Sequence, residues 1–265
     1  MRLFKKSLLS VTIASALAAP FSASQAANYG SFSANVALTS DYYFRGISQT
    51  DNDPAIQGGF DWAHDSGFYA GIWASNVAFG DTNLEADTYL GFSRDTSFGM
   101  NYDIGVIKYN YNNTDSSDDP VEFYGSLGYS FFTAGYAYSN DWFGSGDSSN
   151  YAYLGFDYGL PYEIGLTASV GYSWGDAYKV SDGKDYDYVD YKIGINKDYW
   201  GINWDLSYVD NNLNDTQCNN YGYADKNCDG RFIFTASKAI DDTMQPTDGL
   251  PIAANVALTT DYYFR

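Results

Sequence analysis

The chain has 265 residues, a net charge of −19 and an aromatic composition, with 27 Tyr, 17 Phe and 6 Trp beside 26 Gly. This acidity argues against a nucleic acid as partner, because phosphate binding needs a basic surface. After the first residues, no apolar run approaches the ~20 residues that a membrane-spanning helix needs. The length suits a single β-barrel or β-sandwich domain, and the composition is typical of outer-membrane barrels.

Residues 1–26 have the pattern of a secretory signal peptide. A basic start with Arg2, Lys5 and Lys6 precedes the apolar stretch 8–19, and small residues favour cleavage after Ala26. The apolar stretch is too short for an anchoring helix. Cleavage removes three basic residues and no acidic one, which leaves 11 basic against 33 acidic residues and a net charge of −22. We therefore expect export into an oxidising compartment.

Residues 27–240 are predicted to form one antiparallel transmembrane β-barrel, an all-β fold. In 84–92, for example, the even positions are Leu, Ala, Thr, Leu and Phe, and the odd positions are Glu, Asp, Tyr and Gly. This period of two gives each strand one apolar and one polar face. The pattern predicts about twelve strands, at 32–43, 55–63, 68–77, 84–93, 99–109, 121–129, 131–139, 151–158, 163–173, 187–197, 201–209 and 231–239.

The predicted connections alternate in length. Those after even-numbered strands are short, and those after odd-numbered strands, such as 44–54 and 78–83, are longer and more polar. Barrels of the outer membrane of Gram-negative bacteria have short periplasmic turns and long extracellular loops in this alternation. A soluble sandwich with an aromatic core is the alternative, but the second face is polar on every strand. We expect aromatic girdles at the lipid interfaces, formed by Tyr42, Phe44, Trp62, Tyr129, Tyr138, Tyr158, Tyr172 and Tyr208.

Residues 241–265 contain a partial duplicate of the first predicted strand. Residues 254–265 read ANVALTTDYYFR and match 34–45, ANVALTSDYYFR, at eleven of twelve positions. The offset is almost a whole barrel, so this is not a short-period repeat. We interpret 241–265 as a linker followed by a truncated tandem copy, and the barrel as complete at residue 240.

The strand parity places an excess of acidic residues on the inward faces. Nine acids against three bases would make a negative lumen and a cation-preferring pore if the lumen is open. The alternative is that these residues form hydrogen bonds across a filled interior. The pore-lining candidates are Asp41, Arg45, Asp61, Glu85, Asp87, Asp103, Glu122, Asp157, Asp190, Lys192, Asp205 and Arg231.

Cys218 and Cys228, the two cysteines of the chain, lie in one polar stretch. Because an exported protein meets an oxidising compartment, we expect a disulfide between them, contributing about 2–3 kcal/mol. A metal pair is the alternative, but no histidine lies nearby.

Nothing in the sequence indicates an enzyme, a resident metal or a cofactor. The single histidine, His64, lies in a predicted periplasmic turn, whereas an outer-membrane hydrolase needs a Ser–His pair near the outer rim. Acidic segments at 51–53, 115–119 and 182–187 loosely resemble calcium ligands but lack the EF-hand spacing. We interpret them as solvated loops, with adventitious binding of divalent ions as the alternative.

Both ends of the predicted barrel resemble one known family. The segments ANVALTSDYYFRGISQT (34–50), AIQGGFDW (55–62), GFYAGIWASNV (67–77) and CDGRFIFTASKAI (228–240) are similar to the TorF-type family of proteobacterial, porin-like outer-membrane proteins. The resemblance covers about 34–240. It differs at Ile240, where that family usually has an aromatic residue. It implies an outer-membrane barrel with a porin-like role.

The leading functional hypothesis is a channel for passive diffusion of small polar solutes or cations, embedded in outer-membrane lipid. The second is a non-conducting structural or adhesive barrel that binds ligands through acidic extracellular loops. The third is a soluble secreted β-protein that binds sugars through surface Tyr and Trp. The need for detergent in extraction separates the third from the other two, and conductance separates the first from the second. The sequence predicts neither the solute nor the oligomeric state.

Overall fold

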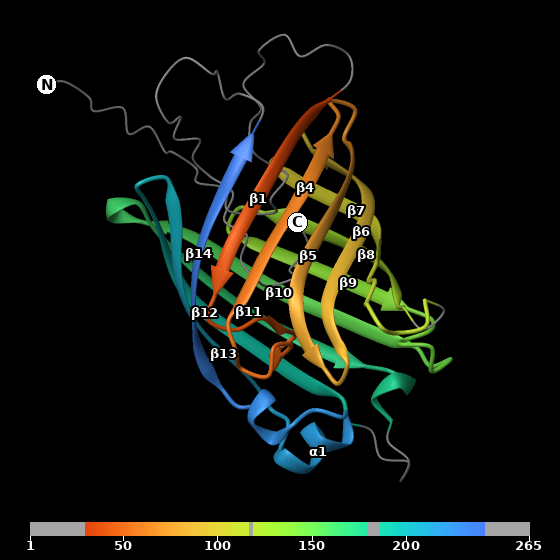
Figure 1. The fold of residues 1–265 in the computed structure, drawn as a ribbon. Coiled ribbons are helices and arrows are strands. Elements are labelled where there is room, and N and C mark those ends of the chain that lie inside the picture. Colours follow the sequence, from red (N-terminus) through yellow and green to blue (C-terminus); the bar gives the residue numbers. More distant parts are fainter. Residues whose placement is uncertain (1–29, 117–118, 180–185, 242–265) are drawn as a thin grey trace, which may run out of the picture.

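Twelve antiparallel strands close into a barrel in the computed structural model, which describes residues 30–116, 119–179 and 186–241 (Figure 1). The barrel strands are β1 (Ser31–Thr39), β4 (Ala55–Ala63), β5 (Phe68–Phe79), β6 (Thr82–Asp95), β7 (Met100–Lys108), β8 (Val121–Tyr129), β9 (Phe132–Ser139), β10 (Ser149–Leu160), β11 (Ile164–Trp174), β12 (Tyr188–Tyr199), β13 (Ile202–Asn211) and β14 (Arg231–Asp241). The predicted fold class is therefore confirmed.

Each barrel strand pairs with its neighbours in chain order, and β14 closes the ring on β1. In that closing pair Thr39 lies opposite Thr235, and on the other side of β1 it lies opposite Ala55. Full closure removes the sheet edges that would otherwise expose unpaired backbone groups. The barrel therefore satisfies the requirement that lipid imposes on backbone hydrogen bonding.

The two ends of the barrel differ in their connections. One end, called here the turn end, carries the tight connections, such as Trp200-Gly201 between β12 and β13. Both of these residues have positive φ, as a two-residue hairpin turn with the right twist requires. The other end, the loop end, carries the longer connections 40–54, 109–120, 140–148, 175–187 and 212–230.

The loop end also carries the small elements outside the barrel wall. A two-stranded ribbon, β2 (Tyr43–Phe44) with β3 (Ile47–Ser48), lies in the first connection. The last connection holds α1 (Asp215–Asn220), which starts with a capping box of Asn214 and Gln217, and the 3-10 turn Asp225–Asn227. None of the helices in the described part of the chain is long and apolar enough to cross a membrane.

Two predicted boundaries are wrong. The first barrel strand ends at Thr39 rather than at residue 43, because the chain then turns into the barrel instead of continuing along the wall. Tyr42 is consequently buried inside the barrel and Phe44 is half-buried there, so neither belongs to an interface girdle. The connection 78–83 is also not long, since β5 and β6 extend to a two-residue turn at Gly80-Asp81.

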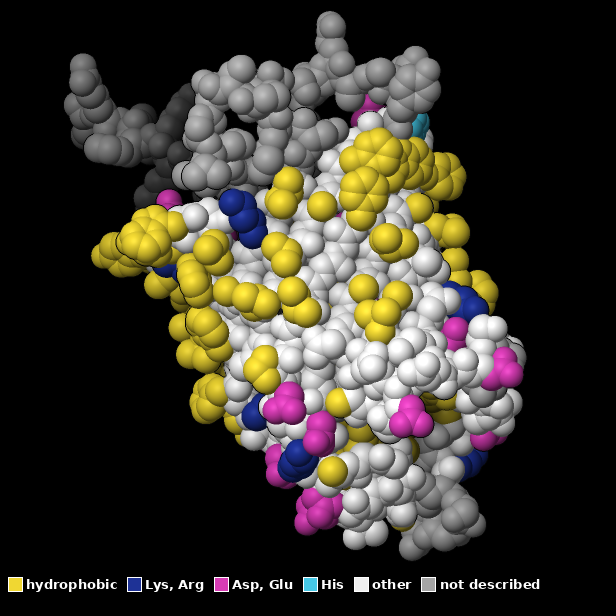
Figure 2. Space-filling view, viewed as in Figure 1, with side chains coloured by type: hydrophobic (Ala, Val, Ile, Leu, Met, Phe, Trp, Pro, Cys, Tyr) yellow, Lys and Arg dark blue, Asp and Glu magenta, His cyan; other side chains and the backbone are white. Residues whose placement is uncertain are grey.

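The outer wall of the barrel is apolar. Leu38, Ile56 and Leu90 expose 60%, 61% and 59% of their surface, and large apolar side chains stand out from the wall on every barrel strand. On the face in Figure 2, apolar side chains spread over the wall, whereas most acidic ones gather at the loop end. A soluble protein does not expose so much apolar surface, and a closed barrel with this exterior crosses the outer membrane of Gram-negative bacteria.

The predicted signal peptide, 1–26, lies outside the described residues. The same holds for 242–265, which include the duplicated strand motif.

Candidate functional site in the barrel interior

Ten of the twelve pore-lining candidates lie on the wall and face the barrel interior. The remaining two, Asp41 and Arg45, also lie inside the barrel, but on the connection 40–54 rather than on a strand. The wall residues are Asp61 on β4, Glu85 and Asp87 on β6, Asp103 on β7, Glu122 on β8, Asp157 on β10, Asp190 and Lys192 on β12, Asp205 on β13 and Arg231 on β14.

The connection 40–54, called here the inward loop, folds into the loop half of the lumen. Tyr42, Tyr43 and Ile47 are each at least 95% buried, although this segment joins two strands at the end of the barrel. Its tip is the turn Arg45-Gly46, where both residues have positive φ and Phe44 pairs with Ile47. A Cβ added to Gly46 would lie 2.9 Å from the Cβ of Asp190, so the tip lies against the wall of β12.

Polar contacts attach the inward loop to several parts of the barrel circumference. The Tyr42 hydroxyl donates to Glu85 on β6 at 2.9 Å, and Arg45 Nη2 donates to Glu122 on β8 at 2.6 Å. On the other side, Asn211 of β13 donates its side-chain amide to the Gly46 carbonyl at 2.7 Å. Since β13 lies well away from both β6 and β8 around the ring, the inward loop extends across the lumen.

The base of the inward loop is organised around Asp41. Ser48 Oγ and Thr50 Oγ1 donate to one carboxylate oxygen at 2.7 and 2.8 Å, and Arg231 of β14 donates to the other at 2.8 Å. Burial raises the pKa of Asp41, although these hydrogen bonds and the Arg231 charge act to lower it. The Asp41 carboxylate therefore connects the two ends of the inward loop with each other and with β14 of the wall.

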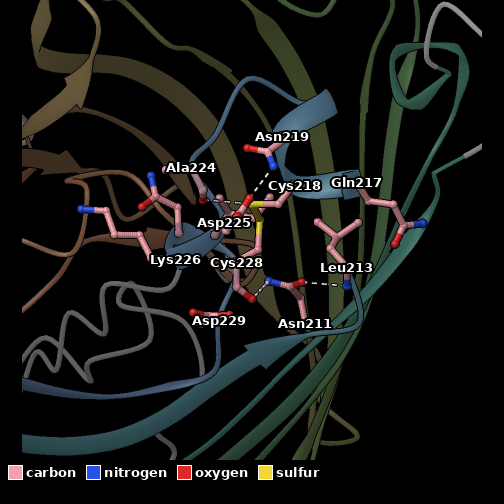
Figure 3. The surroundings of a disulfide bond; sticks show 12 residues. Asn211, Leu213, Gln217, Cys218, Asn219, Ala224, Asp225, Lys226, Cys228 and Asp229 are labelled. Atoms are coloured by element: carbon pink, nitrogen blue, oxygen red, sulfur yellow. Dashed lines mark hydrogen bonds between the residues drawn. A yellow bond between two sulfur atoms is a disulfide. The ribbon is translucent and has the colours of Figure 1, made fainter. Parts of the chain in front are cut away.

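A disulfide-closed loop covers the inward loop from outside. Cys218 and Cys228 form the predicted disulfide, and both cysteines belong to a buried apolar cluster with Ile47. Asn211 connects the two loops, because its side-chain amide also donates to the Cys228 carbonyl at 3.1 Å (Figure 3). Two layers of chain, the inward loop and the disulfide-closed loop, thus lie over the lumen at the loop end.

The turn half of the interior is more open. Along β1, Thr39 and Ala37 are buried, whereas Asn35 nearer the turn end is partly exposed. Along β10, Tyr151 is buried whereas Asp157 is partly exposed. This half is called here the vestibule.

Glycines opposite tyrosines keep space in the vestibule. A Cβ added to Gly135 would lie 2.1 Å from Tyr153 Cε1, and one added to Gly105 would lie 2.4 Å from the Tyr124 hydroxyl. Each ring therefore lies along the wall, over a neighbouring strand, in a position that only a glycine permits. Rings held against the wall leave the axis of the barrel free.

The tyrosine hydroxyls form hydrogen bonds with inward carboxylates. Tyr69 donates to Asp103 at 2.6 Å and lies 2.7 Å from the Tyr124 hydroxyl, and Tyr89 donates to Asp61. These donors stabilise ionised carboxylates without neutralising them. Hydrogen-bonded carboxylates in this arrangement can attract cations or donor groups of polar solutes.

The inward charges are divided along the barrel axis. Among the described strand residues, the inward-facing bases are Lys192 and Arg231, which lie in the loop half of β12 and at the start of β14. The vestibule instead contains Asp61, Asp103, Asp157 and Asp205, each within a few residues of the turn end of its strand. No group of three or more metal-ligating side chains is placed for a metal ion in the described parts of the chain.

Sequence reasoning missed the inward loop. Residues 41–44 read DYYF, and their aromatic character extends the pattern of the first strand. A signal was present in the same segment, because three successive aromatic residues, 42–44, are unusual in a solvated loop. Its partners, including Glu122 and Asn211, are remote in sequence and have no local signature.

Comparison with solved structures supports the barrel fold. One chain, from a structure described as "Unveiling the Mechanism Behind the in-meso Crystallization of Membrane Proteins", aligns with a TM-score of 0.50 at 11% identity, covering 81% of this chain and 85% of that one. The NanC porin aligns with a TM-score of 0.49 at 10% identity, and the KdgM porin with 0.48 at 6%. Each of those two alignments covers 78% of this chain and 98% of the other.

No curated protein matches the chain. A family model does match, over residues 23–240, and it is described as "Bacterial protein of unknown function (Gcw_chp)". The match spans the whole described barrel apart from its last residue, and the chain belongs to the Gcw_chp family of bacterial proteins.

Proposed function

We propose that this protein is an outer-membrane channel for passive diffusion of small polar solutes, with a preference for cations. The observation that carries the proposal is the acidic vestibule, in which Asp61 and Asp157 are partly exposed and Asp103 and Asp205 are buried. Among the described strand residues, it contains no inward base. The resemblance of the two barrel ends to the TorF-type family agrees with a porin-like role.

The mechanism requires no energy source. Carboxylates within a low-dielectric wall focus their field along the lumen and raise the local concentration of cations. The hydrogen bonds from Tyr69 and Tyr89 hold two of these carboxylates in position. Within the vestibule, a solute then exchanges weak contacts along the acidic wall and leaves by diffusion.

The test is single-channel conductance of the refolded chain in a planar bilayer, with a salt gradient across it. We expect discrete conductance steps and a reversal potential of cation-selective sign. The combined variant Asp61→Asn, Asp157→Asn and Asp205→Asn should move the reversal potential toward zero. The matched control neutralises the exposed acids Asp81, Asp147 and Asp229, and it should leave the reversal potential nearly unchanged. Equal shifts in the two variants would contradict the proposed role of the vestibule.

One observation favours the alternative of a non-conducting structural or adhesive barrel. The inward loop and the disulfide-closed loop both cover the loop end of the lumen. Replacing residues 41–53 by a short Gly-Ser linker separates the two functions. Conductance that appears only in this variant identifies a closed channel. A correctly inserted variant without conductance indicates the structural role.

A further inference from the structure

The guanidinium group of Arg45 lies in an aromatic cage. Its Cζ lies 4.2 Å from the Tyr151 ring centroid, 5.5 Å from that of Trp142 and 4.7 Å from that of Phe44. Arg45 Nη2 donates to Glu122 at 2.6 Å, and the two side chains are 5% and 1% exposed. Ring faces around a cation, completed by one carboxylate, are the arrangement by which proteins recognise organic cations.

Four of the cage residues belong to the wall and its connections, not to the inward loop. They are Tyr109 after β7, Glu122 on β8, Trp142 between β9 and β10, and Tyr151 on β10, together called here the cation cage. The Tyr109 hydroxyl donates to Glu122 at 3.1 Å, and the Tyr109 and Trp142 rings meet edge to face at 6.1 Å. These contacts orient the carboxylate and the rings without any help from Arg45.

The position of Trp142 is supported by its own turn. The Trp142 backbone N–H donates to the Asp147 carbonyl at 2.9 Å, and Ser145 Oγ donates to the Trp142 carbonyl at 2.6 Å. These bonds fix the backbone of Trp142 independently of Arg45. A preorganised site of this kind binds a cation with little reorganisation.

Arg45 occupies the cage incompletely. Its Nη1 is buried and has no hydrogen-bond partner among the described residues, so one carboxylate and three ring faces hold the group. Burial acts to lower the pKa of Arg45, but Glu122 and the surrounding tyrosines together raise the pKa well above its ordinary value. The cage thus recognises a positive charge with apolar surface around it. It does not require a partner for every N–H group of a guanidinium.

We propose that the cation cage is a binding site for the guanidinium or alkylammonium group of solutes that enter from the loop end, and that Arg45 occupies it as a tethered competitor. A solute that displaces Arg45 breaks the contact of the loop tip with β8, while Asn211 still holds Gly46, and opens the lumen on the β8 side. The opening step rests on the proposed channel function, whereas binding in the cage does not.

Displacement changes only the tip of the inward loop. Asp41, Ser48 and Thr50 hold the base of the loop near Arg231, apart from the cage. A tethered group has an effective concentration in the millimolar range or above, so we expect free solutes to compete at ~1 mM or more. Such a threshold suits a channel that opens when its solute is abundant.

Binding is tested by titrating the refolded barrel with methylguanidinium in a calorimeter. Methylurea, which is similar in shape and uncharged, is the control ligand. The Arg45→Ala variant should bind methylguanidinium saturably and methylurea not at all. The double variant Arg45→Ala with Glu122→Gln should bind it at least tenfold more weakly. Equal binding by the two variants, or equal binding of the two ligands, overturns the cage. If Arg45→Ala does not insert, Arg45→Met keeps the apolar stem and replaces it.

Opening is tested separately by conductance of the unchanged chain. Methylguanidinium added at the loop end should raise the conductance, and methylurea should not. One contrary result is that the Arg45→Ala variant binds methylguanidinium and conducts, while the unchanged chain shows no rise in conductance when methylguanidinium is added. That result overturns the proposal that a solute displaces Arg45. If Arg45→Ala binds methylguanidinium but neither this variant nor the linker variant of residues 41–53 conducts, the channel function is wrong. The cation cage is then still supported as a binding site.

Discussion

The two halves of the barrel interior share the same twelve strands but differ in chemistry. In the loop half, the inward loop buries the wall and pairs charges, with Arg45 on Glu122 and Arg231 on Asp41. In the vestibule, carboxylates such as Asp103 accept hydrogen bonds from tyrosines and have no inward base beside them among the described strand residues. The same wall therefore surrounds a loop half that is filled by the inward loop and a vestibule that is acidic.

This difference shows that the strands do not by themselves decide whether the lumen is open. Alternation supplies an inward polar face along the whole length of each strand. The same face is buried throughout the part onto which a connection folds, whereas residues such as Asn35 and Asp157 on the other part are partly exposed. The inward loop thus fills one half of the lumen and leaves the other half without such a filling, and each half can be perturbed without the other.

The largest effect is expected from breaking the buried ion pair of the loop half. Glu122→Gln leaves the Arg45 guanidinium buried without its counter-charge, which typically costs about 3–5 kcal/mol. Urea-induced unfolding in lipid micelles should show this loss. A loss below about 1 kcal/mol would mean that the inward loop leaves the lumen readily and that the two halves are alike.

A smaller effect is expected when the disulfide is removed. Replacing Cys218 and Cys228 by Ser should destabilise the loop end by about 2–3 kcal/mol, because the crosslink closes only a short loop. Hydrogen exchange should accelerate at amides of the inward loop, which packs on the cysteines through Ile47. Amides near the turn end, for example in β7, serve as the internal control. Equal acceleration at both ends would contradict the separation of the halves.

Substitution of a vestibule glycine should have a moderate effect. Gly135→Ala places a Cβ 2.1 Å from Tyr153 Cε1, so the ring must leave the wall, at about 1–3 kcal/mol for such overpacking. The displaced ring should also narrow the vestibule and lower the conductance. Gly155→Ala is the matched control, since its nearest neighbour would lie at 3.8 Å. Similar conductance in the two variants would contradict the idea that Gly135 allows the Tyr153 ring to lie along the wall.

The smallest effect is expected at the exposed contact between the two loops. Lys226 Nζ lies 2.8 Å from Asp51 Oδ2, but the two side chains are 55% and 45% exposed. Lys226→Gln should therefore change the unfolding free energy by only about 0–1 kcal/mol. The same unfolding assay measures it beside Glu122→Gln. Equal losses in the two variants would show that burial does not decide the strength of these pairs.

The sequence by itself determined the wall of this barrel. The alternation in 84–92 predicted both the strand β6 and its inward face, including Glu85 and Asp87. It did so because strand geometry alone sends successive side chains to opposite sides. The disulfide was predictable as well, since the chain has two cysteines and an export pattern.

Only the tertiary structure decided what occupies the lumen inside the wall. The segment DYYF continues an aromatic strand pattern, so nothing local shows that the chain leaves the wall after Thr39. The contacts of Arg45 and Gly46 with Glu122 and Asn211 join residues 77 and 165 positions apart. Such contacts form only when the closed ring brings distant strands around one lumen. Local periodicity therefore sets the faces of the strands, and long-range packing sets the state of the lumen.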